Sequence, residues 1–129
     1  MPLVSAHLAG SGYHVSLQAR GHRFFADEPD ELGGSDRAPT PQEHLAAALA
    51  ACVAITVRMY ARRKQWPLAG VLVNVDYLEG KDRPAFECRV RFDGNLDPAQ
   101  RGRLLEIAGR CPVHRLLGTG ADVTTRMEE

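Results

Sequence analysis

Three cysteines are the residues of this 129-residue chain best suited to chemistry: Cys52, Cys88 and Cys111. An odd number at wide spacing does not resemble the dense disulfide framework of small secreted domains, so any role that they have depends on reactivity. Arg110 and His114 flank Cys111, and positive charge favours the thiolate that acts as nucleophile. Cys111 is also expected at the C-terminal end of a helix, whose partial negative charge disfavours thiolate. We therefore expect Cys111 to be attacked, or to attack late, and not to be permanently ionised.

Other roles for the cysteines stay open at this point. Cys88 lies on the apolar face of an alternating segment, which favours a place in the core. Cys52 could simply be a small residue that packs within an alanine-rich helix. Cys111 and His114 have the C-x-x-H spacing of half a zinc site, but no second pair lies nearby, so no metal is expected. A cysteine hydrolase would need a histidine such as His44 or His114 as its base, and neither lies in a recognisable local signature.

The element that must position Cys52 is a long helix predicted over residues 40–64. Thr40 and Glu43 form a Thr-x-x-Glu capping box, and Pro41 suits the first helical position. No Gly or Pro follows until Pro67. At about 1.5 Å per residue the helix would be roughly 35 Å long. It therefore has the length to run through the middle of a small domain.

The surface of this helix is apolar on nearly all sides as far as Arg58. A single sheet can cover only one side of a helix, so the opposite side needs another partner. We infer that two copies of the chain associate through this helix as a homodimer.

The remaining pattern predicts strands and one more helix in a single domain over residues 1–129. A second helix is expected from Asp97 to Cys111, ended or kinked by Pro112, and residues 113–117 have the composition of one further helical turn. The predicted fold class is α+β, with an antiparallel sheet of about six strands packed on the long helix. The strands are expected at residues 3–8, 13–18, 22–26, 71–77, 86–92 and 121–127.

Composition narrows the choice of partner and compartment. Lys and Arg number 16 and so do Asp and Glu, which gives a formal net charge of zero. Such a chain has no overall field that attracts nucleic acid or an anionic membrane, so neither partner is expected. The N-terminus has no signal-peptide pattern, and the longest apolar run, residues 45–57, is too short to span a bilayer comfortably. We expect a soluble, cytoplasmic protein.

Two motifs together resemble one family. The segment DEPDELGGSDRAPTPQEHLAAALAAC ends at Cys52, and CPVHR begins at Cys111. Both resemble the OsmC/Ohr superfamily of thiol-dependent peroxidases, and TVRMYARRKQWPLAGVLVNV is similar to the OsmC-like branch. The resemblance covers most of the chain. It implies an OsmC-like fold in an intertwined homodimer, with strands of both chains wrapped around two long central helices.

The resemblance also implies a mechanism. Cys52 would attack the distal oxygen of an organic hydroperoxide, release an alcohol and become a sulfenic acid. Cys111 would then condense with it to form an intramolecular disulfide. A thiol reductant, either a dithiol or a small protein, would restore both thiols. No metal or bound cofactor takes part in this scheme. The alternative is a non-catalytic protein of the same fold that binds a small molecule or senses redox state.

Members of the peroxidase branches carry an acidic residue directly after the helix-opening proline and an arginine in the N-terminal region. Here Gln42 follows the proline, and the carboxylate is displaced to Glu43. Arg37 is the first candidate for the arginine, before Arg20 and Arg23. Glu43 precedes Cys52 by nine residues, which is about 13–14 Å along a helix. Any support that it gives to the thiolate must therefore come from the partner chain of the dimer.

Overall fold

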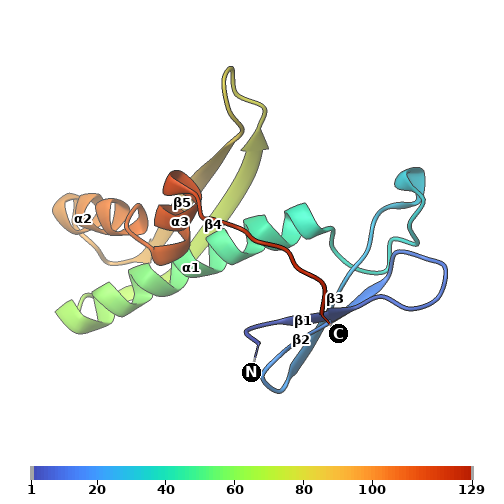
Figure 1. Ribbon diagram of the computed structural model, residues 1–129. Helices are drawn as coiled ribbons and strands as arrows, with labels where there is room; N and C mark the ends of the chain where they lie inside the picture. Colours follow the sequence, from blue (N-terminus) through green and yellow to red (C-terminus); the bar gives the residue numbers. More distant parts are fainter. Residues whose placement is uncertain (1, 129) are drawn as a thin grey trace. The chain divides into compact units, whose positions relative to one another are not determined.

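The computed structural model describes residues 2–128 and has the α+β composition that the sequence predicts (Figure 1). Its five strands form two antiparallel sheets, one with the order β1-β2-β3 and one with the order β4-β5. The chain divides into two compact units, the first ending at Leu45 and the second beginning at Ala46. The single domain over residues 1–129 stays a prediction.

The first unit is built on a three-stranded meander. Strands β1 (Ser5–His7), β2 (Val15–Ala19) and β3 (His22–Ala26) pair in sequence order. The β2–β3 hairpin turns at Arg20, which has a φ of 57°. The predicted hairpin and third strand are therefore confirmed, and the bounds of β3 are those expected from the sequence.

A buried carboxylate orders the loop after β3, which contains the short 3-10 helix η1 (Asp30–Leu32). Asp27 accepts backbone hydrogen bonds from Glu28 at 2.7 Å, Arg37 at 3.3 Å and Ser35 at 3.4 Å. Burial would raise the pKa of Asp27, but these three N–H groups hold it below its ordinary value. The loop is therefore held by the Asp27 carboxylate together with backbone hydrogen bonds, such as that from Asp36 to Glu28.

Helix α1 (Pro41–Lys64) begins where the capping box predicts. The Thr40 hydroxyl accepts from the N–H of Glu43 at 3.1 Å, and Glu43 Oε1 accepts from the N–H of Thr40 at 2.8 Å. By length and composition, α1 is the one helix among residues 2–128 that could cross a membrane, a property that the core helix of a globular protein shares. The absence of membrane association stays a prediction.

In the second unit, α1 buries one stripe and exposes another. Leu49, Val53, Val57 and Ala61 recur every four residues and are buried, as one face of a helix requires. Ile55 and Met59 leave the opposite side apolar, and each is 58% exposed. The apolar surface all round the helix is thus confirmed, whereas the homodimer inferred from it stays a prediction.

The sheet of the second unit is a long hairpin of β4 (Leu68–Leu78) and β5 (Ala85–Gly94). Alternate residues of both strands turn toward the core, as the period-two pattern predicts. These inward residues pack against the buried stripe of α1; they are Val71, Val73, Val75, Phe86, Cys88, Val90 and Phe92.

Two features of the C-terminal region differ from expectation. The second helix is two helices, α2 (Pro98–Ala108) and α3 (Pro112–Thr119), because Pro112 cannot continue α2 and starts α3 instead. The strand expected at 121–127 is absent, because no other strand of the described residues pairs with it. The prediction of one sheet of about six strands was therefore wrong: residues 2–128 form three strands in one sheet and two in another.

Candidate functional site

Two of the three cysteines lie next to each other in the second unit. Cys52 is half-buried on α1 between the buried residues Leu49 and Val53, and Cys111 is fully buried before α3. Cys52 lies near enough to Cys111 to raise the pKa of its thiol, and both thiols are free. Cysteines 59 positions apart in the chain are thus brought together by the packing of α3 against α1. A half-buried thiol beside a fully buried one is an arrangement in which only the first is open to a reagent.

Cys111 is the N-cap residue of α3, not the last residue of a helix. Its backbone is extended, with φ −67° and ψ 149°, as the residue before a proline prefers. Its Sγ accepts a hydrogen bond from the backbone N–H of His114 at 3.3 Å. The expected helix C-terminus was therefore wrong, because Pro112 opens a helix here. The partial positive charge of a helix start favours thiolate, so the local field has the opposite sign to that expected.

Burial affects the pKa of the Cys111 thiol more than the hydrogen bond from His114 does. It raises the pKa of this thiol, the hydrogen bond from His114 lowers it in part, and the neighbouring Cys52 thiol raises it further. The net pKa lies above the ordinary value, so Cys111 rests as a neutral thiol. The expectation that it is not permanently ionised agrees with this environment, although for a different reason.

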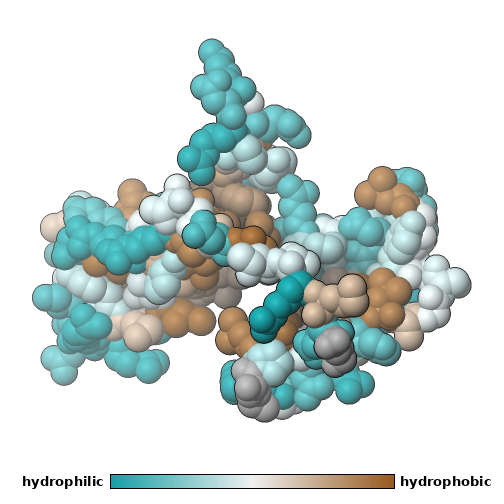
Figure 2. All heavy atoms as spheres, viewed as in Figure 1, coloured by the Kyte–Doolittle hydropathy of each residue, from teal (hydrophilic) through white to brown (hydrophobic). Residues whose placement is uncertain are grey.

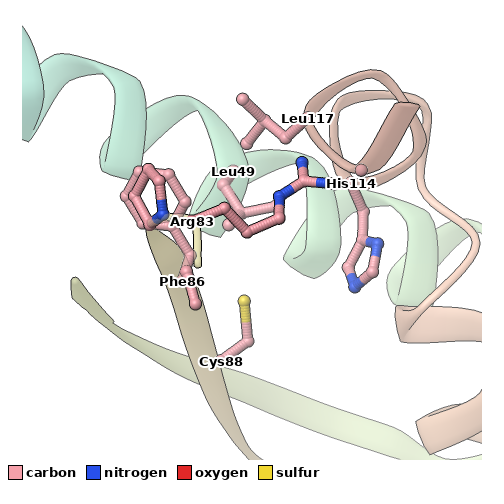
Figure 3. A pocket seen from close by; sticks show the side chains of 9 residues that line it. Leu49, Arg83, Phe86, Cys88, His114 and Leu117 are labelled. Carbon is pink, nitrogen blue, oxygen red and sulfur yellow. The ribbon is translucent and has the colours of Figure 1, made fainter. Parts of the chain in front are cut away.

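Cys88 packs against the core from β5, as its strand pattern predicts. Burial raises the pKa of its thiol. It also lines a cavity of about 350 Å³ between α1, the end of the β4–β5 hairpin and α3 (Figure 3). A smaller cavity of about 130 Å³ shares Cys88 and His114 with the larger one. The strand pattern predicts a core position for Cys88 and does not indicate that it borders a cavity.

Two residues of the larger cavity were not assigned to it from sequence. Arg83 comes from the hairpin turn and His114 from α3. His114 was weighed as a charge beside Cys111, as half of a zinc site and as the base of a hydrolase, but not as a cavity residue. Its side chain borders the cavity, while its N–H donates to Cys111. The other histidine considered for that role, His44, lies in the first unit with Nε2 2.6 Å from the carbonyl oxygen of Phe25.

The two predicted supporting residues, Glu43 and Arg37, also lie in the first unit. The carboxylate of Glu43 is engaged in the capping box with Thr40. The backbone N–H of Arg37 binds Asp27, and its side chain is exposed. Their support of the Cys52 thiolate stays a prediction. Within residues 2–128, no three His, Cys, Asp or Glu side chains gather as metal ligands would.

A comparison of the sequence with protein families decides the relationship. The family model described as OsmC-like protein matches residues 33–126, which include both Cys52 and Cys111. The chain belongs to the OsmC-like family. The resemblance found in the two cysteine motifs is therefore confirmed. A search of curated proteins finds no match to this OsmC-like chain.

Solved structures show the same fold. One from Psychrobacter arcticus 273-4, named for osmotic stress and a detoxification response, has a TM-score of 0.77 at 22% identity and covers 89% of this chain and 87% of its own. An OsmC-like protein from Mycoplasma pneumoniae has a TM-score of 0.74 at 18% identity, with 89% and 85% covered. An organic hydroperoxide resistance protein OsmC from Legionella pneumophila has a TM-score of 0.60 at 24% identity, with 88% and 86% covered.

Proposed function

We propose that this OsmC-like protein is a thiol-dependent peroxidase that reduces organic hydroperoxides to alcohols. The observation that carries the proposal is the proximity of the free thiols of Cys52 and Cys111. Two free thiols that lie near each other are suited to alternate between a dithiol and a disulfide. Family membership supports the same chemistry, since the Legionella pneumophila relative is named for resistance to organic hydroperoxides.

Each of the two cysteines performs one step of the proposed reaction. The Cys52 thiolate attacks the distal oxygen of the hydroperoxide; the O–O bond breaks, and the alkoxide takes up a proton and leaves as an alcohol. Cys52 is now a sulfenic acid. Cys111 loses its proton and attacks the Cys52 sulfur, which forms the disulfide and releases water. A dithiol or small thiol protein then reduces the disulfide by exchange and is itself oxidised.

The surroundings of each cysteine suit its proposed step. Cys52 is half-buried, so a peroxide can reach it, and its neighbours on α1 are apolar. Apolar neighbours favour alkyl hydroperoxides over hydrogen peroxide, because burial of alkyl surface contributes to binding. Cys111 is buried and neutral until its step, when negative charge develops on Sγ. The N–H of His114 and the start of α3 then stabilise that charge.

The proposal also includes a homodimer and two residues that support the Cys52 thiolate. The exposed Ile55 and Met59 on α1 would be covered in a homodimer. Glu43 and Arg37 would support the Cys52 thiolate, Glu43 from the partner chain. Three free thiols also suit the cytoplasm, where cysteines stay reduced.

Thiol titration tests the proposal directly. The reduced chain has three thiols, and one equivalent of cumene hydroperoxide should leave one. Peptide mapping should then find a disulfide between Cys52 and Cys111 within one chain. Cys52→Ser should abolish the loss of thiols and the turnover, whereas Cys88→Ser, the matched control, should leave both intact. Retention of all three thiols by the wild-type protein would refute the peroxidase.

A second candidate, a non-catalytic binding or redox-sensing protein, is favoured by one observation. The carboxylate expected to hold the thiolate is replaced by Gln42 at its usual position, and that of Glu43 is engaged in a capping box. A non-catalytic binding protein would keep its three thiols in the same titration. A sensor would lose thiols but would also show a partner complex that changes on oxidation.

A further inference from the structure

The larger cavity of the second unit has an uneven chemical lining. Leu49, Phe86 and Leu117 supply apolar walls from α1, β5 and α3. Arg83 and His114 supply hydrogen-bond donors, and none of the nine lining residues is acidic. An apolar space with a few convergent polar groups is the usual form of a small-molecule site. The lining therefore indicates a ligand with an apolar body and an anionic head.

Arg83 lies in the hairpin turn, where it is exposed and borders the cavity. Gly80 has a φ of 65°, and a Cβ atom there would collide with the carbonyl oxygen of Arg83, so the backbone of the turn is closely packed at this point. Figure 2 shows that hydrophilic residues cover the end of this hairpin. In Figure 3 the Arg83 side chain extends from the turn toward α3, and the Cys88 thiol points into the space beside it.

The guanidinium of Arg83 has no carboxylate partner in this arrangement. The arginines that form ion pairs among residues 2–128 are Arg89, Arg91 and Arg103, and Arg83 is not one of them. A guanidinium presents a planar fork of N–H donors that matches a carboxylate in two parallel hydrogen bonds. An unpaired arginine beside an apolar cavity thus has the geometry for an incoming carboxylate.

We propose that this cavity binds a small organic carboxylate, with its alkyl body against Leu49, Phe86 and Leu117 and its head group at Arg83 and His114. A volume of about 350 Å³ equals roughly twelve water molecules at about 30 Å³ each. Octanoate, with its short alkyl chain, is of suitable size and serves as the probe. Neither Cys52 nor Cys111 lines the cavity, so binding of the ligand requires no reaction at either thiol.

The site shares one residue with the cysteine pair. The side chain of His114 borders the cavity, and its backbone N–H is the hydrogen-bond donor to Cys111. A ligand that fixes His114 would therefore also fix the start of α3. By linkage, the oxidation state of Cys111 and the occupancy of the cavity should influence each other.

Titration calorimetry of the full chain with octanoate, and with 1-octanol as the neutral probe, tests the proposal. Octanoate should bind with one site per chain, at least tenfold more tightly than 1-octanol. Arg83→Gln should weaken octanoate binding at least tenfold. Lys81→Gln is the matched control, because it removes the same charge from the same turn at a residue that does not line the cavity. Circular dichroism would establish that both variants are folded.

A second readout locates the ligand. Alkylation of Cys88 by iodoacetamide, followed by peptide mapping of the wild-type protein, should be slowed by saturating octanoate. Absence of octanoate binding, equal binding by Arg83→Gln, equal binding of 1-octanol, or alkylation of Cys88 that octanoate leaves unchanged would each overturn the proposal. Thiol titration with cumene hydroperoxide reports on Cys52 and Cys111 separately, so failure of one proposal is distinguishable from failure of the other.

Discussion

Cys111 has a structural role as well as its proposed chemical one, and two substitutions separate them. Serine is among the preferred N-cap residues and keeps an acceptor at the start of α3. It cannot form a disulfide. Alanine removes the acceptor, so the N–H of His114 loses its partner. Both Cys111→Ser and Cys111→Ala should therefore prevent the disulfide, whereas only the alanine variant should lose the cap.

The size of the effect follows from two contributions to the free energy of unfolding that Cys111→Ala removes. Removal of an N-cap acceptor costs about 1 kcal/mol. Cys111 is fully buried, and removal of one buried group about the size of a methylene costs about 0.8 kcal/mol more. Cys111→Ala should therefore lower the free energy of unfolding by about 2 kcal/mol, or the Tm by about 8 °C. Cys111→Ser should stay within about 1 kcal/mol of the wild type.

Urea denaturation of the three reduced proteins measures this difference. Protein concentration is held equal, because the stability of the proposed homodimer would depend on it. A slope m that is the same in all three proteins would show that only stability changed. The reasoning fails if the alanine variant is as stable as the serine variant, since the hydrogen bond from His114 would then contribute nothing.

Three further measurements concern stability. Because its pKa is lowered in the folded protein, ionised Asp27 should stabilise the fold above the ordinary aspartate pKa of about 3.9, and this stabilisation should be lost as pH falls through the folded pKa. Asp27→Asn should therefore lower the free energy of unfolding more at pH 7 than at pH 3. A difference from the wild type that stays constant with pH would contradict this. The raised pKa values of Cys88 and Cys111 predict that the free energy of unfolding of the reduced protein is highest below about pH 8.5 and declines as pH rises toward the folded pKa values. Cys88→Ala should make this decline less steep. A wild-type free energy of unfolding that does not change with pH in this range would be inconsistent with the prediction. Leu104→Ala should cost about 2–5 kcal/mol because Leu104 is fully buried, while Leu105→Ala at a mostly exposed position is the control and should change stability by less than about 0.5 kcal/mol.

Elements governed by local rules were predictable from the sequence. The capping box at Thr40 and the proline after it fixed the start of α1, and the bounds of β3 were those expected. Alternation predicted the inward faces of β4 and β5. The strand at 121–127 failed because alternation shows only that a segment suits a sheet. Whether it joins one depends on a neighbouring strand, which no local pattern contains.

The candidate site was predictable to a different degree in its two parts. Cys52 and Cys111 were singled out by context and by family resemblance, which carry information on contacts between distant segments. The cavity was not, because Arg83 and His114 come together only through the packing of a hairpin end against α3. Nothing in a turn such as that around Arg83 distinguishes a ligand-binding arginine from a solvated one. Tertiary packing decides which of the two it is.

The prediction that Cys111 lies at a helix C-terminus was wrong, although the sequence contains the signal against it. Apolar periodicity carries the second helix through Cys111, but Pro112 forces the residue before it out of helical geometry and suits the first position of a new helix. The Cys-Pro pair therefore reverses the local field at the thiol from a helix end to a helix start. A proline that serves as a stop signal for one helix thus places the buried cysteine where a developing thiolate is stabilised. In this chain the break between two helices is part of the chemistry proposed for the site.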